Sequence, residues 1–206
     1  IIPFPKIRAS SHKQDNRFIK VDEQIQADIE QGFPGAALMV IKDGKVIKNT
    51  AYGYAKKYAN GGELLTSPVP MSTSTIFDLA SNTKMFATNL ALMKLISEGR
   101  ININKPVSFY LPDYQSSGRE TRLIKDLLTH SAGYASQIRF FDKNNKFGMD
   151  FYSQNSKRTK QFILNKVPFS IGRNTQHIYS DTDFMLLGML VERITGKTLD
   201  QYCEYD

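Results

Sequence analysis

A serine and a lysine three positions apart are the first residues in this chain that could do chemistry. Ser81 stands where a loop enters an apolar helical segment, and Lys84 follows one helical turn later. Residues i and i+3 share a helix face, so the Lys84 amine can lie beside the Ser81 hydroxyl. A serine hydroxyl needs a nearby base before it attacks a carbonyl group, and a desolvated lysine can lose its proton and act as that base. Alone, the pattern also fits a surface helix with a capping serine and a solvated lysine.

A second candidate element, Tyr179-Ser180-Asp181, also stands directly before an apolar helical segment. A phenol near a serine–lysine pair can carry a proton to a leaving group. Taken by itself, the element is more typical of a packed tyrosine followed by an aspartate that caps a helix. The chemical interpretation therefore depends on whether the fold brings the two elements together.

The first third of the chain predicts a helix and a β-hairpin. Apolar residues recur three to four positions apart over Phe18–Gln31, which is the spacing of an amphipathic helix. Asp43-Gly44 separates two apolar runs, and this pair favours a two-residue hairpin turn because both turn positions need a positive φ. The stretch Lys56–Ser74 is rich in Gly, Ser, Thr and Pro and is predicted to be a loop.

The rest of the chain predicts mostly helices. Ser81–Glu98 is apolar nearly all round, so this helix is expected inside a domain. A short helix is predicted over Arg119–Thr129 and another apolar helix over Thr182–Thr195. The intervening Ser136–Thr175 is polar and studded with aromatic residues, and its pattern indicates neither helix nor strand.

This order of elements predicts an α+β fold. We expect an N-terminal arm over residues 1–17, a helix and hairpin that form part of an α/β subdomain over 18–80, and a mainly helical subdomain over 81–206. A two-stranded hairpin is marginal alone, so the sheet is expected to need strands that this chain does not visibly supply.

Composition excludes several classes of protein. The chain has 206 residues, 41% of them hydrophobic and 23% charged, which is typical of a soluble globular protein. The single cysteine, Cys203, excludes an intrachain disulfide framework and a cysteine-based zinc site. The three histidines are isolated, and no phosphate-binding glycine loop is present, so no metal or other cofactor is predicted. The net charge of +7 is spread along the chain without a recognition motif, so we expect no nucleic-acid partner.

Three motifs in a fixed order resemble those of a known superfamily. They are Phe77–Lys84 with its Ser-Asn-Thr-Lys, Asp126–Gly133, and Tyr179-Ser180-Asp181 with the helix that follows. Together they resemble the serine β-lactamase and penicillin-binding protein superfamily, in particular its class C β-lactamase-like branch, which also holds D,D-peptidases and esterases. Within that branch the Tyr-Ser-Asp form is most similar to the penicillin-binding protein 4B group. The resemblance implies an antiparallel sheet flanked by helices, plus a helical subdomain.

The resemblance also implies a role for each motif. Ser81 would be the acylated nucleophile, and its N–H would supply half of an oxyanion hole. Lys84 and Tyr179 would share the general-base and general-acid work. Ser180 and Asp181 would contact the substrate. The loop that begins at His130 would be structural, with its imidazole satisfying backbone groups.

Two departures from the superfamily pattern bear on activity. Asp181 stands where the Tyr-x-Asn motif has asparagine, and an ionised aspartate cannot donate a hydrogen bond to a substrate carbonyl. Its charge near Lys84 would favour the ammonium form and make that lysine a poorer base. The second departure is that the superfamily's Lys/His-Thr/Ser-Gly strand is not found in this sequence, so the C-terminal strands are expected to be absent from the chain.

The leading functional hypothesis is a serine hydrolase that works through an acyl-enzyme, of the D,D-carboxypeptidase kind, on D-Ala-D-Ala cell-wall peptides. A class C β-lactamase or an esterase of the same fold is the near alternative, and a non-catalytic binder of peptidoglycan or β-lactams is the second. The expected partner is a cell-wall peptide or β-lactam, with a possible peripheral association with the envelope. The expected location is periplasmic or extracellular in a bacterium, although no signal peptide is visible, and the sequence does not predict an oligomeric state.

Overall fold

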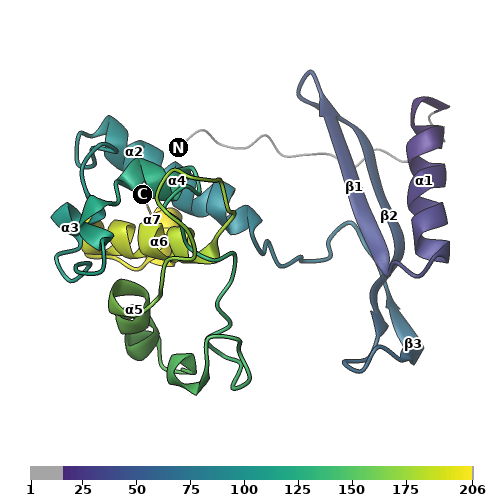
Figure 1. Ribbon diagram of the computed structural model, residues 1–206. Helices are drawn as coiled ribbons and strands as arrows, with labels where there is room; N and C mark the ends of the chain where they lie inside the picture. The colour runs from purple at the N-terminus through teal and green to yellow at the C-terminus, as the bar shows by residue number, and fades with distance from the viewer. Residues whose placement is uncertain (1–15, 206) are drawn as a thin grey trace. The chain divides into compact units, whose positions relative to one another are not determined.

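The computed structural model describes residues 16–205, and the predicted N-terminal arm therefore lies almost wholly outside the described residues. The chain forms two compact units, one ending at Asp78 and the other beginning at Leu79. Each unit is described by itself below. The predicted α+β class is confirmed, because one unit carries an antiparallel sheet and the other is helical (Figure 1).

The first unit consists of a helix laid along a three-stranded sheet (Figure 1). A short 3₁₀ turn, Asn16–Phe18, leads into helix α1 (Ile19–Glu30), which confirms the helix predicted from the apolar spacing. The strands are β1 (Gly35–Lys42), β2 (Lys45–Tyr58) and β3 (Leu64–Pro70), in the spatial order β1-β2-β3.

The β1–β2 hairpin is the one predicted at Asp43-Gly44. Its strands are antiparallel, with Gly35 opposite Gly53 at one end and Lys42 opposite Lys45 at the turn. Asp43 has φ +51° and Gly44 has φ +70°, the left-handed pair that a two-residue hairpin turn requires.

The prediction of a loop over Lys56–Ser74 is wrong. Strand β2 runs on to Tyr58, and β3 follows after a turn and pairs antiparallel with β2. Pro68 and Pro70 favoured the loop prediction. They are compatible with β3 because it is an edge strand, and its open side has no partner strand that would need the missing N–H donors.

The second unit is helical. Its elements are a π-helical turn at Lys84–Asn89, α2 (Leu90–Ser97), α3 (Val107–Tyr110), a 3₁₀ turn at Arg119–Thr121, α4 (Ile124–Leu128), a 3₁₀ turn at Met149–Phe151, α5 (Ser156–Asn165), α6 (Asp181–Thr195) and α7 (Leu199–Tyr205). The helix predicted over Thr182–Thr195 is confirmed as α6, which ends at Gly196 with φ +72°.

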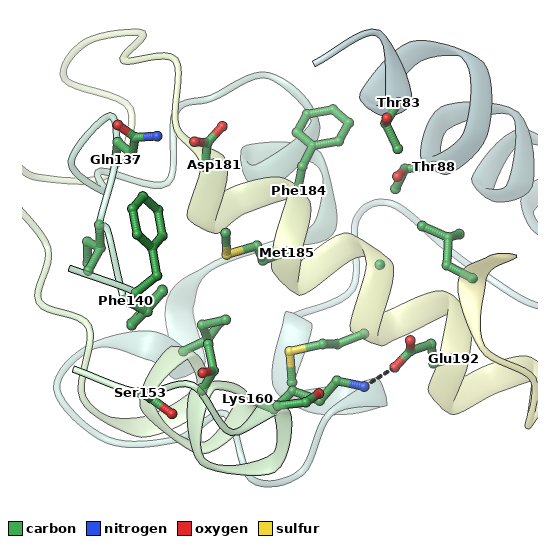
Figure 2. A pocket seen from close by; sticks show the side chains of 18 of the residues that line it. Thr83, Thr88, Gln137, Phe140, Ser153, Lys160, Asp181, Phe184, Met185 and Glu192 are labelled. Carbon is green, nitrogen blue, oxygen red and sulfur yellow. Dashed lines mark hydrogen bonds and ion pairs between the residues drawn. The ribbon is translucent and has the colours of Figure 1, made fainter. Parts of the chain in front are cut away.

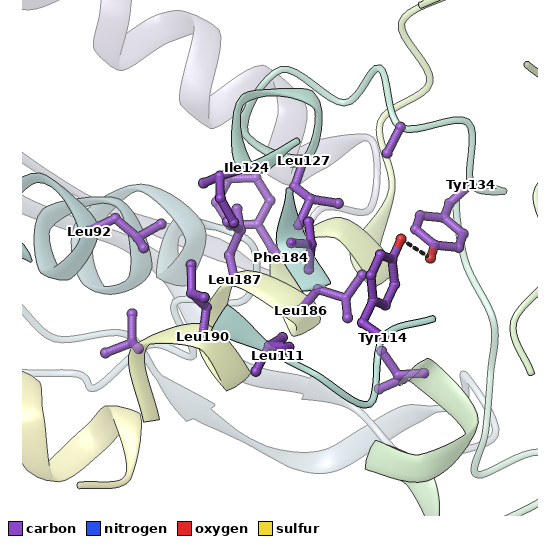
Figure 3. Close-up of a cluster of buried hydrophobic side chains, with 14 of the residues drawn as sticks. Leu92, Leu111, Tyr114, Ile124, Leu127, Tyr134, Phe184, Leu186, Leu187 and Leu190 are labelled. Atoms are coloured by element: carbon purple, nitrogen blue, oxygen red, sulfur yellow. Dashed lines mark hydrogen bonds between the residues drawn. The ribbon is translucent and has the colours of Figure 1, made fainter. Parts of the chain in front are cut away.

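Helix α6 is the centre of the hydrophobic core of this unit. Leu186, Leu187 and Leu190 are buried on α6 and pack with Leu92 of α2 and Leu127 of α4 (Figure 3). The buried hydroxyls of Tyr114 and Tyr134 form a hydrogen bond of 2.6 Å at the side of this cluster (Figure 3). Since α6 begins at Asp181, the core holds the start of this helix, and with it the Tyr179-Ser180-Asp181 element, in a fixed place.

Two helix predictions for this unit need correction, and one helix was not predicted. The predicted helix Arg119–Thr129 is split into a 3₁₀ turn and α4. Helix α5 lies inside the stretch that gave no assignment, because most of its residues are polar and Phe162 and Ile163 are its only buried residues. The helix predicted from Ser81 begins with a π-helical turn, and it is only half buried, with Met85, Phe86, Leu90 and Met93 exposed on one side.

None of the helices in residues 16–205 is long and apolar enough to cross a membrane.

Candidate active site

Ser81 lies in a strained turn that leads into the π-helical segment. The residue before it, Ala80, has φ +44°, a left-handed conformation that costs a non-glycine residue of the order of 1 kcal/mol or more. Such strain and π-helical turns both occur preferentially at functional sites. The Ser81 side chain is exposed, so its hydroxyl can be reached by a ligand.

Lys84 connects the two predicted elements. Its Nζ lies 3.1 Å from Ser81 Oγ and 2.7 Å from Asp181 Oδ1. The ammonium also stands 4.9 Å from the centroid of the Tyr179 ring, within range of a cation–π interaction. Only 13% of the Lys84 side chain is exposed. The structure thus brings together Ser81, Lys84, Tyr179 and Asp181, although nearly a hundred residues of chain separate the two elements.

The ion pair fixes the charge of the lysine. Burial alone would lower the pKa of the Lys84 amine, but hydrogen bonds with Asp181 and Tyr179 and the charge of Asp181 outweigh burial and raise it. Hydrogen bonds with Lys84 and with Ser81 lower the pKa of the Tyr179 phenol. The group with a depressed pKa in this site is therefore the phenol, and the neighbouring Lys84 ammonium favours its ionisation.

The segment before α6 is joined to the loop that follows α4 by several hydrogen bonds, four of which involve residues 178–181. Backbone bonds join Ile178 N to His130 O (2.9 Å) and Asp181 N to Ser136 O (3.0 Å). Between them, Ser180 donates from its N–H to His130 Nδ1 (3.2 Å) and from its hydroxyl to Ala135 O (2.7 Å). Ser180 is fully buried, so its side chain holds the loop and does not lie with the other predicted site residues.

Gly133 makes this close pairing of loops possible. Its φ is +99°, and an added Cβ would lie against the backbone carbonyl oxygen of Ile171 at less than any ordinary contact distance. Gly133 O in turn accepts the N–H bonds of Ser170 and Ile171. A glycine is required here both for the backbone conformation and for the space.

The sequence motifs indicated a structural role for His130, whereas the buried Asp183 beside it was not predicted. The His130 ring lies 4.7 Å from the Tyr179 ring and 5.2 Å from the Phe184 ring, and its Nδ1 lies 3.0 Å from Oδ2 of the buried Asp183. The available signal was a second aspartate within the first turn of an otherwise apolar helix, a position where burial of a carboxyl group requires a partner.

A cavity of about 730 Å³ opens beside Lys84 and Asp181. It follows one face of α6 past Phe184 and Met185 and ends near the ion pair of Lys160 with Glu192 (Figure 2). Its size and mixed apolar and polar lining are those of a small-molecule site. Within residues 16–205, no group of three His, Cys, Asp or Glu side chains is placed to hold a metal ion.

The fold is that of the superfamily indicated by the sequence motifs, and comparison with known families agrees. The Beta-lactamase family matches residues 18–205. The chain belongs to the beta-lactamase family.

Relatives and solved structures place the chain within this family. It is 46% identical over 193 residues to "N-acetylmuramyl-L-alanine amidase" of Bacillus subtilis (strain 168), covering 91% of this chain and 43% of that protein. It is 39% identical over 213 residues to "Putative D-alanyl-D-alanine carboxypeptidase" of Salmonella agona (strain SL483), covering 98% of this chain and 48% of that protein. The crystal structure of FmtA from Staphylococcus aureus matches with a TM-score of 0.68 at 26% identity, over 98% of this chain and 50% of that one. A class C beta-lactamase has the same fold, with a TM-score of 0.68 at 20% identity, over 93% of this chain and 48% of that one. The chain thus spans about half the length of the curated relatives that it matches.

Proposed function

We propose that this protein is a serine hydrolase that forms an acyl-enzyme on Ser81. The observation that carries the proposal is the position of Lys84 Nζ, 3.1 Å from Ser81 Oγ and 2.7 Å from Asp181 Oδ1, under the ring of Tyr179. A nucleophile, a group that can take its proton and a group that holds the charge are thus within hydrogen-bonding reach of one another.

The charges assign the proton transfers. Tyr179 takes the proton of the Ser81 hydroxyl as Oγ attacks the carbonyl carbon, because its pKa is lowered and it hydrogen-bonds Ser81. Lys84 remains an ammonium and stabilises the phenolate. Tyr179 then gives the proton to the leaving group as the carbonyl–leaving-group bond breaks. Water hydrolyses the resulting ester by the same steps in reverse order, and Ser81 is regenerated.

We propose D-Ala-D-Ala cell-wall peptides as the substrate class, with D,D-carboxypeptidase activity. The names of the Salmonella relatives support this choice, as does the cavity beside Lys84, which is large enough for a short peptide. A cell-wall substrate implies a location in the periplasm or outside the cell, and the net charge of +7 suits a peripheral association with an acidic envelope.

A second candidate is an amidase that cleaves the bond between N-acetylmuramic acid and L-alanine. The relative with 46% identity carries that name, and both reactions use the same attack on an amide carbonyl. Within the family fold, an esterase, a class C β-lactamase and a non-catalytic binder of β-lactams or peptidoglycan are the further alternatives.

Intact-protein mass spectrometry of the complete protein after exposure to a penicillin tests acylation. We expect an adduct with the mass of one penicillin, its absence in Ser81→Ala, and its retention in the matched variant Ser97→Ala, whose hydroxyl only donates to the Lys94 carbonyl. No adduct on the unmodified protein, together with no consumption of the penicillin, would contradict the acyl-enzyme and favour the binder.

Product analysis separates the remaining substrates. Release of D-alanine from a D-Ala-D-Ala pentapeptide supports the carboxypeptidase. Release of L-alanine-linked peptide from a muramyl peptide supports the amidase, and turnover of a nitrophenyl ester alone supports the esterase. Rapid hydrolysis of the penicillin itself, with no persistent adduct, supports the β-lactamase.

A further inference from the structure

Asn60 and Gly61 lie in the turn that joins strands β2 and β3, and both residues are exposed. Asn60 is the only asparagine in the 206-residue chain that is followed by a glycine. Glycine has no Cβ to keep the side-chain carbonyl carbon of the preceding residue away from the glycine nitrogen. The turn therefore holds an electrophile and a nucleophile on neighbouring residues, at a place that water reaches.

The hydrogen bonds that close this turn use neither of the two reacting groups. The Ala59 N–H donates to Glu63 O (2.8 Å), and the Gly62 N–H donates to Ala59 O (3.0 Å). Within residues 16–205, neither the Gly61 N–H nor the Asn60 side chain has a hydrogen-bond partner. No bond has to be broken before the Gly61 nitrogen can approach the Asn60 side chain.

Two other asparagines show how the surroundings can oppose the same reaction. Asn82 is exposed, but its neighbour Thr83 has a β-branched side chain, and the Thr83 N–H already donates to Ala80 O (3.1 Å). Asn155 caps helix α5, and its Oδ1 accepts the Arg158 N–H (3.0 Å). In both cases a hydrogen bond holds one of the groups that would have to react.

We propose that Asn60 is a site of spontaneous covalent modification, at which the side-chain amide is lost through a cyclic imide formed with Gly61. The Gly61 nitrogen bonds to the side-chain carbonyl carbon of Asn60, the carbon–nitrogen bond of the side-chain amide breaks, and ammonia leaves with the proton from Gly61. Water then opens the imide at either carbonyl group. Opening at the side-chain carbonyl gives an aspartate, and opening at the main-chain carbonyl gives an isoaspartate.

The isoaspartyl product changes the turn, because its main chain runs through the side chain and is one carbon atom longer. The Ala59–Glu63 hydrogen bond closes the turn across Asn60, and the Tyr58–Leu64 pair is the first pair of the β2–β3 ladder beyond it. Strand β3 is held on one side only, and its register with β2 is already irregular on both sides of Lys56. The lengthened turn therefore opens at the Ala59–Glu63 bond. This inference goes beyond the proposed function, since it involves neither the nucleophile nor a substrate.

Peptide mapping of the complete protein tests the modification. After incubation in mildly alkaline buffer, we expect the tryptic peptide of residues 58–84 to gain the mass difference between an amide and an acid, with the change located at position 60. Both aspartate and isoaspartate should form there, and more slowly in mildly acidic buffer, because the deprotonated glycine nitrogen is the attacking group. Asn82, in the same peptide, should keep its amide.

Three variants define the reacting groups. Asn60→Ser should lose the product entirely, whereas the matched surface variant Asn165→Ser should form it at position 60 as the unmodified protein does. Gly61→Ala should slow its formation several-fold. Gly61 does not have a positive φ, and an added Cβ would meet only the carboxylate of the exposed Glu63 side chain, which can move away.

The folded protein is compared with its own isolated peptide of residues 58–84. If position 60 keeps its amide in the folded protein over the time in which the isolated peptide loses it, the turn protects the asparagine and the proposal is wrong. Retention of the amide in both samples overturns it equally. The readout is a mass and requires no activity, so it stands whether or not Ser81 forms an acyl-enzyme.

Hydrogen exchange tests the effect on the turn. The product carries an additional negative charge, so ion exchange separates it from the unmodified protein. In the isoaspartyl form, the Ala59 N–H should exchange several-fold faster than in the unmodified protein, while the amides paired between β1 and β2 keep their rates. Equal exchange of the Ala59 N–H in the two forms would overturn the opening of the turn.

Discussion

Lys84 Nζ and Asp181 Oδ1 are 2.7 Å apart, so the lysine of the Ser-x-x-Lys pair is half of an ion pair. This contact joins the first turn of α6 to the segment that carries Ser81, and it keeps the amine protonated. A lysine in this state cannot take the serine proton, and the base must be found elsewhere. In the mechanism proposed above, the base is the Tyr179 phenol, whose pKa is lowered.

Asp181→Asn should speed acylation of Ser81 by a penicillin, by about tenfold for each unit by which the pKa of the Tyr179 phenol falls, because the charge of Asp181 opposes ionisation of that phenol. An amide removes the charge that holds the ammonium and adds an N–H donor for the substrate carbonyl. Stopped-flow measurement with a fluorescent penicillin gives the rate, and Asp113→Asn is the matched control on the surface. An unchanged or slower rate would count against this view of Asp181.

Tyr179→Phe should reduce the acylation rate by roughly 100-fold or more, the usual contribution of a general base. The phenylalanine ring retains the cation–π contact with Lys84, so the loss reports the hydroxyl itself. Tyr152→Phe is a close control, because its ring also lies under a lysine, Lys143, at 5.4 Å. Equal rates for Tyr179→Phe and the unmodified protein would return the role of base to Lys84.

The acylation rate should rise with pH through a midpoint below 10, the ordinary pKa of a tyrosine, because hydrogen bonds with Lys84 and Ser81 lower that of Tyr179. The deprotonated phenol is the reactive form, so the rate falls on the acid side of the midpoint. A pH–rate profile of Ser81 acylation measures it. In Tyr179→Phe this ascending limb should vanish, and its persistence there would assign it to another group.

Asp183→Asn should stabilise the folded protein at neutral pH relative to the unmodified chain. The folded-state pKa of Asp183 is raised from 3.8 to about 6, so the folded state binds this proton more tightly than the unfolded state. The stability that the group contributes is therefore complete below pH 4 and lost as the pH rises to 6, by about 3 kcal/mol. Urea unfolding of both proteins at pH 4 and pH 7 measures the change, and a difference between them that does not vary with pH would refute it.

Gly133→Ala should destabilise the helical unit by roughly 2 kcal/mol more than Gly148→Ala does. The two glycines have similar positive φ values, +99° and +92°, so both substitutions carry the same backbone strain. Only at Gly133 does the new methyl group meet a backbone carbonyl, that of Ile171, whereas nothing lies within 4 Å at Gly148. Thermal unfolding of both variants measures their stabilities. Equal losses of stability would mean that the loop at Ile171 moves aside without a cost in free energy.

The local elements and the reactive pair could be derived from the sequence. The hairpin followed from Asp43-Gly44, helix α6 from its apolar spacing, and the proximity of Ser81 to Lys84 from the geometry of one helical turn. Each of these rests on interactions between residues close in sequence, which is why a linear pattern suffices to predict them. The superfamily motifs then indicated the α+β fold, and the structure confirms it.

Only the tertiary structure could show which side chains from distant parts of the chain contact one another. Asp181 neutralises Lys84, Ser180 turns into the protein to bind Ala135, and Asp183 lies against His130, because the core around α6 fixes two separate loops side by side. Strand β3 was hidden for a similar reason, since prolines are compatible with a strand only when it is at the edge of a sheet. The sequence by itself determined which side chains are available for chemistry, and the packing of α6 against the His130 loop decided their protonation and their partners.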